Sequence, residues 1–92
     1  IMKQSMLAGL HMRTYDQLDT STQPIRGVQV LEVNDRSLAW FSGVRPGDVI
    51  LSANTKNTAR VSELLTIAKT NPDRLLLEIR RLEGIIFIVM DK

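Results

Sequence analysis

The side chains that could do acid–base or nucleophilic chemistry are few in this chain, and their spacing does not favour catalysis. His11 is the only histidine, and there is no cysteine. Nucleophilic catalysis needs a nucleophile, a base to accept its proton and a third group to orient that base. His11 lies on an expected strand with no acidic residue beside it, which favours a surface strand residue over a catalytic one. We therefore expect a domain that is not an enzyme.

Metal, cofactor and phosphate sites are not expected either. Metal binding through nitrogen and oxygen needs clustered His, Asp or Glu side chains, whereas the ten carboxylates of this chain are dispersed. The five glycines stand singly, at positions 9, 27, 43, 47 and 84, so a glycine-rich phosphate loop is absent. The sequence predicts no metal and no cofactor.

The charge pattern and hydropathy also argue against nucleic acid and membrane partners. Twelve Lys and Arg oppose ten Asp and Glu, and Arg80-Arg81 is the only adjacent basic pair. A nucleic-acid binder usually shows a basic stripe and stacking aromatics, but the chain has four aromatic residues in all. The longest apolar run, residues 85–90, is far too short to cross a bilayer. We expect no nucleic acid and no membrane insertion, which leaves binding of proteins or peptides.

The strands that would position a binding site follow from apolar alternation and β-branched residues. A short turn at residues 82–84 makes the last two strands a hairpin. Because residues 1–6 make a poor strand, the sheet edge beside the first strand is expected to be closed by the last one. The expected strands are residues 7–13, 28–33, 49–51, 75–79 and 85–89, with a polar connection at residues 14–26.

Two helices are expected from their end signals. Ser37 is a good N-cap for a two-turn helix through residue 41, and Gly43 can end it in the left-handed conformation. Pro46-Gly47 then fits a type II turn. A second helix is expected over residues 61–70, ended by Asn71-Pro72. Strands and helices together predict a small α+β domain.

Residues 37–50, SLAWFSGVRPGDVI, closely resemble the helix–turn–strand signature of PDZ domains. That signature runs S-x-A-x-x-x-G-Φ-x-x-G-D-Φ-Φ, and every fixed position matches. It is structural, because it folds the domain and binds nothing directly. The chain departs from the family where Leu38 replaces a frequent proline, Trp40-Phe41 replaces smaller residues, and Arg60 stands where a capping Ser is common.

The resemblance extends from Leu7 to the end of the chain and is strongest to the C-terminal (second) PDZ domain of HtrA-type serine proteases, the Do, DegP and DegQ group. It implies the bacterial, circularly permuted order, with the carboxylate loop at the N-terminus. The implied fold is a small, partly open antiparallel β-sandwich or barrel of about five strands capped by two helices. Residues 1–6 are then a disordered or linker end, and residues 7–92 a single PDZ domain.

The resemblance also implies a site in which an extended peptide adds a strand to a sheet edge and its terminal carboxylate meets main-chain amides. Gly9 would permit both the turn and a close approach of the carboxylate. Val61 and Ala68 are expected near the middle of the apolar arc of the second helix, facing the core. The expected carboxylate-binding loop is Leu7, Ala8, Gly9 and Leu10, and the expected groove is Leu10, His11, Met12, Arg13, Arg60, Leu64 and Ile67.

Plainer interpretations stay open for each of these residues. Leu64 and Ile67 are alternatively core residues, and Gly9 is alternatively a turn glycine. Trp40 and Phe41 are alternatively core or core-edge residues. If they are exposed, they are candidate assembly contacts together with Arg80 and Arg81.

Two functions remain in balance. One is capture of hydrophobic peptide or protein C-termini for an attached protease, and the other is assembly with other domains and subunits of that protease. The resemblance implies a parent serine endopeptidase whose Ser-His-Asp machinery lies upstream, an interpretation that fits a chain beginning with Ile1. It also implies a periplasmic or cell-envelope location and a part in protein quality control. The alternative is an interaction scaffold in another envelope machine, a secretion component or tail-specific protease.

Overall fold

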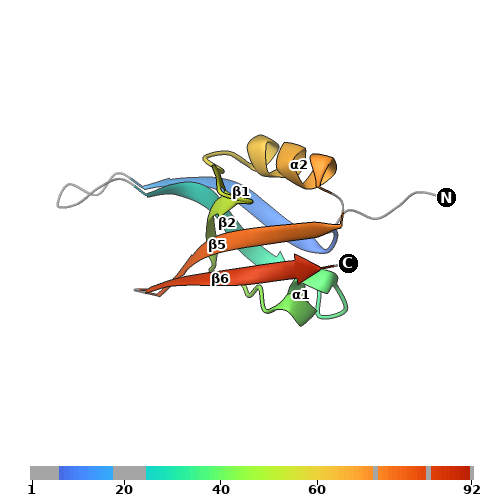
Figure 1. Ribbon diagram of the computed structural model, residues 1–92. Helices are drawn as coiled ribbons and strands as arrows, with labels where there is room; N and C mark the ends of the chain where they lie inside the picture. The colour runs from blue at the N-terminus through green and yellow to red at the C-terminus, as the bar shows by residue number, and fades with distance from the viewer. Residues whose placement is uncertain (1–6, 18–24, 72, 83, 92) are drawn as a thin grey trace.

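The computed structural model describes residues 7–17, 25–71, 73–82 and 84–91, and the expectation for residues 1–6 lies outside them. The described chain folds into six strands and two helices (Figure 1). In chain order they are β1 (Leu10–Gln17), β2 (Ile25–Val33), α1 (Leu38–Ser42), β3 (Val49–Ala53), β4 (Lys56–Asn57), α2 (Val61–Thr70), β5 (Arg74–Arg81) and β6 (Gly84–Asp91).

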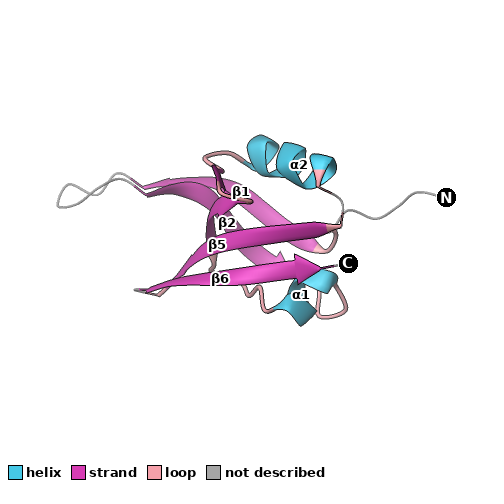
Figure 2. Cartoon of the chain, viewed as in Figure 1, coloured by secondary structure: helices cyan, strands magenta, loops and turns pink. Residues whose placement is uncertain are grey.

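All the described strand pairs are antiparallel, in the order β1-β2-β3-β5-β6, with the two-residue β4 paired to β3. Figure 2 shows α2 on the β1 and β2 side of these strands and α1 next to the end of β6. This small open sheet with two helices confirms the predicted fold class. The sheet has six strands rather than about five because the polar loop after β3 contains β4.

The two sheet edges differ from the sequence expectation. We expected the last strand to close the edge beside the first, but β6 pairs with β5 from Arg74↔Asp91 to Arg81↔Gly84. Strand β1 pairs with β2, from Leu10↔Val33 to Gln17↔Ile25, so the expected polar connection at residues 14–26 is strand at both of its ends. The short hairpin holds β6 against β5 along its whole length, and this places β6 at the opposite edge of the sheet. In the described part of the chain, the free side of β1 therefore has no strand beside it.

Local capping signals produce the predicted first helix and the turn after it. Ser37 Oγ accepts a hydrogen bond from the Trp40 N–H at 3.2 Å, and Gly43 ends α1 with φ +112°. The Asp48 N–H donates to the Arg45 carbonyl at 3.2 Å, closing the turn that contains Gly47 with φ +94°. The PDZ-like signature is thus realised as a capped helix, a glycine stop and a turn into β3.

Helix α2 spans the predicted residues although its N-cap residue, Arg60, makes no side-chain capping bond. Two other side chains satisfy N–H groups at this end. Thr14 Oγ1, on β1, accepts from the Val61 N–H at 3.2 Å, and the Glu63 carboxylate accepts from the Ala59 N–H at 3.1 Å. The first N–H groups of a helix lack partners within it, so such acceptors stabilise its start.

The core lies between the sheet and α2, and it corrects the expected orientation of that helix. Leu64 is fully buried, and Ile67 and Ala68 are nearly so, whereas Val61 is only partly buried and Leu65 is 47% exposed. The inward face is thus centred on Leu64 rather than on Val61 and Ala68. Including Leu65, which is exposed, in the apolar arc shifted its expected centre, and the packing of α2 on the sheet decides which side is buried.

An ion pair between buried Asp48 and partly exposed Arg81 joins the α1–β3 connection to the end of β5. The Asp48 carboxylate accepts from Arg81 Nε at 2.8 Å, from Arg81 Nη2 at 2.7 Å and from the Arg45 N–H at 2.9 Å. Arg81 Nη2 also donates to the Gly43 carbonyl at 2.7 Å. The hydrogen bonds to Asp48 raise the pKa of Arg81 above its ordinary value. The Arg81 guanidinium is therefore engaged inside the domain.

Candidate functional site

The segment expected to bind a carboxylate forms a tight turn at the start of β1. The Leu10 N–H donates to the Leu7 carbonyl at 3.2 Å, and Gly9 between them has φ +87°. The Leu7 side chain is 4% exposed and belongs to the core, so it anchors the turn rather than facing a ligand. The Gly9 carbonyl accepts from the Asn34 N–H at 2.9 Å. The turn is thus anchored to the core through Leu7 and to the segment before α1 through the Gly9 carbonyl.

Gly9 is required by the protein's own packing as well as by its backbone angle. A Cβ added there would lie 2.8 Å from Ser37 Cβ and 3.0 Å from Asn34 Cβ. A β-carbon does not tolerate so close a contact, and a positive φ of this size favours glycine. The close approach that we expected for a carboxylate is therefore made, on the Cβ side, by the residues before α1.

Two main-chain donors of the turn are available for a ligand. Among the described residues, the N–H groups of Ala8 and Gly9 donate to no acceptor, and Gly9 is exposed to solvent. The third expected donor, the Leu10 N–H, is occupied by the Leu7 carbonyl. Successive free N–H groups in a turn form a concave site for an anion. The turn thus leaves two successive N–H groups without an acceptor in the described part of the chain.

Strand β1 presents two different faces beside its open edge. Leu10 and Met12 are partly buried and pack against the core, whereas His11 and Arg13 are exposed. Arg13 Nε donates to Gln29 Oε1 at 2.6 Å, and His11 borders a shallow depression with Glu32 and Asp35. No group of three acidic or histidine side chains in the described part of the chain is close enough to hold a metal ion.

The α2 side of the expected groove is closed by its own side chains. Leu64 has no exposed surface and Ile67 is 8% exposed, as the core interpretation expects. Their contact with a ligand stays a prediction, and it requires Leu10 or Met12 to move aside, or α2 to shift. Arg60 is exposed at the N-terminal end of α2, where it borders a depression with Thr14, Arg26, Ala59 and Glu63.

The hydrogen bond between the Val61 N–H and Thr14 Oγ1 marks the far end of the groove. Neighbouring strands lie about 4.8 Å apart, so an added strand needs far more room between β1 and α2 than one direct hydrogen bond leaves. The contact therefore closes the space beside β1 at Thr14. The sequence carried no signal for this role of Thr14, because its partner is 47 residues away.

The four predicted assembly residues are not alike in the structure. Phe41 is 75% exposed on α1, and Trp40 is partly buried with the Arg45 guanidinium 3.7 Å from its ring centre. Arg80 is partly exposed on β5, while the Arg81 guanidinium is bound to Asp48. Phe41 is thus the one of the four that projects freely as a large apolar side chain. No helix among the described residues is long and apolar enough to cross a membrane.

Comparison with known proteins gives consistent results. A family model described as the PDZ domain matches residues 29–81. The chain is 35% identical over 65 residues to the periplasmic serine endoprotease DegP of Salmonella typhimurium, covering 71% of this chain and 14% of that protein. It is 27% identical over 75 residues to a probable periplasmic serine protease, do/HhoA-like, of Haemophilus influenzae, covering 82% and 15%.

A solved structure agrees at the level of the fold. The crystal structure of the HtrA3 PDZ domain bound to a phage-derived ligand, FGRWV, superposes with a TM-score of 0.75 and is 29% identical. The match covers 90% of this chain and 80% of that one. The chain spans about a seventh of the length of the curated relatives it matches, so it corresponds to one part of such proteins.

Proposed function

The chain belongs to the PDZ domain family, and we propose that it is the interaction module of an HtrA-type periplasmic serine protease that binds hydrophobic C-termini. PDZ domains are protein-interaction modules and not catalytic ones, and the proteases among the relatives are much longer than this chain. The observation that carries the proposal is the open edge of β1, which starts at a turn with two unpaired N–H groups.

In the proposed complex, the ligand adds an antiparallel strand beside Leu10 to Arg13. Its main chain then hydrogen-bonds to the free side of β1, which gives affinity whatever the ligand sequence. Its terminal carboxylate accepts from the N–H groups of Ala8 and Gly9. Hydrogen bonds to an ionised acceptor are about twice as strong as neutral ones, so the carboxylate contributes strongly to affinity.

Selectivity is proposed to come from the inward-facing side chains. The last side chain of the ligand would enter between Leu10 and Met12 on β1 and Ile67 on α2, which are all apolar and belong to the core cluster or pack against it. Only an apolar group can replace these contacts without leaving a buried polar atom unpaired. Hydrophobic C-terminal residues are therefore preferred, and their binding requires the groove to open.

A peptide titration tests this proposal. The probe is FGRWV, the ligand in the related crystal structure, as the free acid and as the C-terminal amide. Calorimetry should show that amidation weakens binding by at least about tenfold, because the charge and one acceptor oxygen are lost. Equal affinity for the two forms would reject carboxylate capture.

A matched pair of variants tests the location of the groove. Met12→Ala removes an inward-facing side chain at the proposed site, whereas Leu65→Ala removes an exposed one from the outer face of α2. We expect Met12→Ala to weaken binding of free-acid FGRWV by roughly five- to tenfold, and Leu65→Ala by less than about twofold. The opposite ranking would place the ligand elsewhere.

Assembly of the parent protease is a second candidate function, and the exposure of Phe41 favours it. A large aromatic side chain that is 75% exposed on a short helix is a suitable anchor for another domain or subunit. The test is to compare the number of subunits per particle in the full-length parent with that in a Phe41→Ser variant and in a version without this domain. An unchanged number of subunits in both would reject the assembly function.

A further inference from the structure

The outward side of β6 carries an apolar stripe that the peptide-binding proposal does not use. Ile85 is 48% exposed, Phe87 65% and Val89 54%. They alternate with residues that face inward, of which Ile88 is 7% exposed and Met90 is fully buried. A strand has a side-chain period of two, so the three exposed side chains stand in a row on one face of the sheet.

The edge of β6 also lacks the features that usually prevent strands from associating. Its described residues from Gly84 to Met90 include no charge and no proline, and its ladder with β5 runs without a bulge. The other edge strand, β1, has an irregularity between His11 and Met12 and carries exposed His11 and Arg13. Natural sheets protect their edges with charges, prolines and bulges, and a long apolar edge is otherwise a site of pairing.

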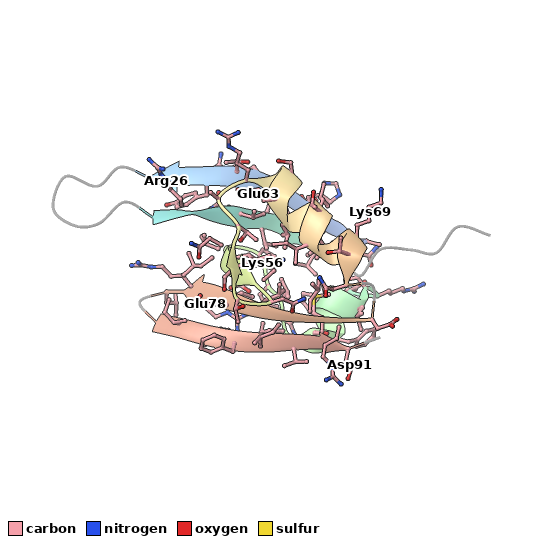
Figure 3. All side chains as sticks on the ribbon, turned by 45° about the horizontal axis from the view of Figure 1, so that its top comes forward. Arg26, Lys56, Glu63, Lys69, Glu78 and Asp91 are labelled. Atoms are coloured by element: carbon pink, nitrogen blue, oxygen red, sulfur yellow. The ribbon has the colours of Figure 1, made fainter. Side chains whose placement is uncertain are left out.

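Helix α1 does not cover the stripe. A Cβ added to Gly43, at the end of α1, would lie 3.7 Å from Ile88 Cδ1, so the helix packs on the inward side of β6. On the outward side, the residues of β5 opposite the stripe are Arg80, Glu78 and Leu76. In Figure 3, Glu78 and Asp91 are labelled near β5 and β6 in the lower part of the view, and Glu63 and Lys69 near α2 in the upper part.

We propose that β6 pairs with β6 of a second copy of this chain, antiparallel and centred on Phe87. In this register Phe87 lies opposite Phe87 of the second copy, and Ile85 lies opposite Val89 of the second copy. Every residue of the stripe then meets an apolar residue, whereas a shift of two positions in either direction leaves one stripe residue without an apolar partner. A pattern that matches itself in this way suits an isologous twofold interface. The pairing would continue the sheet from one copy into the next.

The contact is expected to be weak and concentration-dependent. The three side chains expose on the order of 300 Å² per chain, against about 800 Å² per partner in a standard interface. Main-chain hydrogen bonds along the paired strands add to this area. We expect a reversible dimer with a dissociation constant of roughly 0.1–1 mM for the isolated domain.

The absence of cysteine allows a direct test of the register. Directly opposite residues of an antiparallel strand pair have Cα atoms about 4.5–5.5 Å apart, which lies within the range of a disulfide. Phe87→Cys should therefore form a disulfide-linked dimer under mild oxidation. In Ile85→Cys, the two cysteines would stand four residues apart, about 13 Å, and should crosslink far more slowly. Leu65→Cys, on α2, measures the rate of random collision.

Sedimentation velocity of the wild-type domain at increasing concentration provides the second measurement. Phe87→Lys should keep the domain monomeric at all concentrations, whereas Leu65→Lys should leave the self-association within about twofold of wild type. A wild-type domain that stays monomeric to millimolar concentration overturns the proposal. So does a dimer that survives Phe87→Lys, or a Phe87→Cys variant that crosslinks no faster than Leu65→Cys.

Discussion

Asp48 shows how one residue can be required for folding although it lies inside a binding-domain signature. Its side chain is 2% exposed, and its carboxylate accepts three hydrogen bonds, two of them from Arg81. A buried charge is tolerated only when it is paired and hydrogen-bonded. The signature therefore depends on a partner 33 residues away, on a strand that the signature does not contain.

Replacing Arg81 should reveal this dependence. Arg81→Met leaves the Asp48 carboxylate buried without its cation and should lower the free energy of unfolding by about 2–4 kcal/mol. Arg74→Met breaks the pair with Asp91, in which both side chains are more than half exposed, and should cost less than about 1 kcal/mol. Urea denaturation of the two variants checks the ranking, and equal costs would contradict it.

The pKa of Arg81 also sets the pH range in which this pair contributes. A base whose pKa is raised by folding adds stability below its ordinary pKa, and this stability is lost as the pH rises through the raised value. The pKa of Arg81 therefore gives the pair no pH dependence near neutrality.

Replacing Gly9 should destabilise the protein, whereas replacing another glycine, Gly84, should not. Gly9→Ala forces an alanine to φ +87° and places its Cβ 2.8 Å from Ser37 Cβ, so we expect a loss of roughly 2–3 kcal/mol in unfolding free energy. Gly84→Ala meets no atom within 4 Å at an ordinary φ and should change stability by less than about 0.5 kcal/mol. Thermal unfolding of both checks the contrast. If Gly9→Ala left the stability unchanged, the positive φ and the close contact with Ser37 would be contradicted.

At the scale of elements, the start of α2 is coupled to the edge strand through a single hydroxyl. Thr14 Oγ1 replaces the N-cap side chain that Arg60 does not supply. The contact joins the two walls of the proposed groove, so the stability of α2 and the length of the groove depend on the same hydrogen bond. The coupling is therefore a property of α2 and β1 together.

Thr14→Val tests the coupling with a nearly isosteric change. Loss of the acceptor should lower the free energy of unfolding by about 0.5–1 kcal/mol. Thr66→Val is the control, since the Thr66 hydroxyl donates to the Ser62 carbonyl within the exposed face of α2, and it should be neutral within about 0.3 kcal/mol. Hydrogen exchange should show faster exchange at the first amides of α2 in Thr14→Val alone. Unchanged exchange there would contradict the capping role.

At the scale of the whole molecule, the two proposed interaction surfaces lie on opposite edges of one sheet. Strands β2, β3 and β5 separate β1 from β6. An added strand at one edge leaves the other edge exposed, so one molecule can bind a peptide and a second copy at the same time. Such an arrangement would bring two peptide sites together in one assembly.

This geometry predicts that the two interactions are independent. Phe87→Lys should leave the dissociation constant for free-acid FGRWV within about twofold of wild type, because sites far apart without shared partners usually behave additively. Calorimetry at a concentration where the wild type is monomeric measures this. A change of more than about fivefold would mean that β6 and the groove are coupled or share a ligand.

Local sequence signals predicted the elements that depend on neighbours in the chain. Ser37, Gly43 and Gly47 act through caps and turns that span three or four residues, and the structure confirms each of them. The same holds for the bounds of α2 and for the β5–β6 hairpin. The carboxylate-binding turn was placed from a resemblance, and its occupancy by a ligand stays a prediction.

What the amino-acid sequence determined by itself is the two helices, their turns and five of the six strands, because capping, turn geometry and side-chain alternation are decided within a few residues. Only the tertiary structure decided which strand edges stay open, which face of α2 is buried around Leu64, and that Gly9 packs against Ser37. These features depend on contacts between segments far apart in the chain, and no local pattern specifies such contacts. The edges and the groove are therefore properties of the folded sheet.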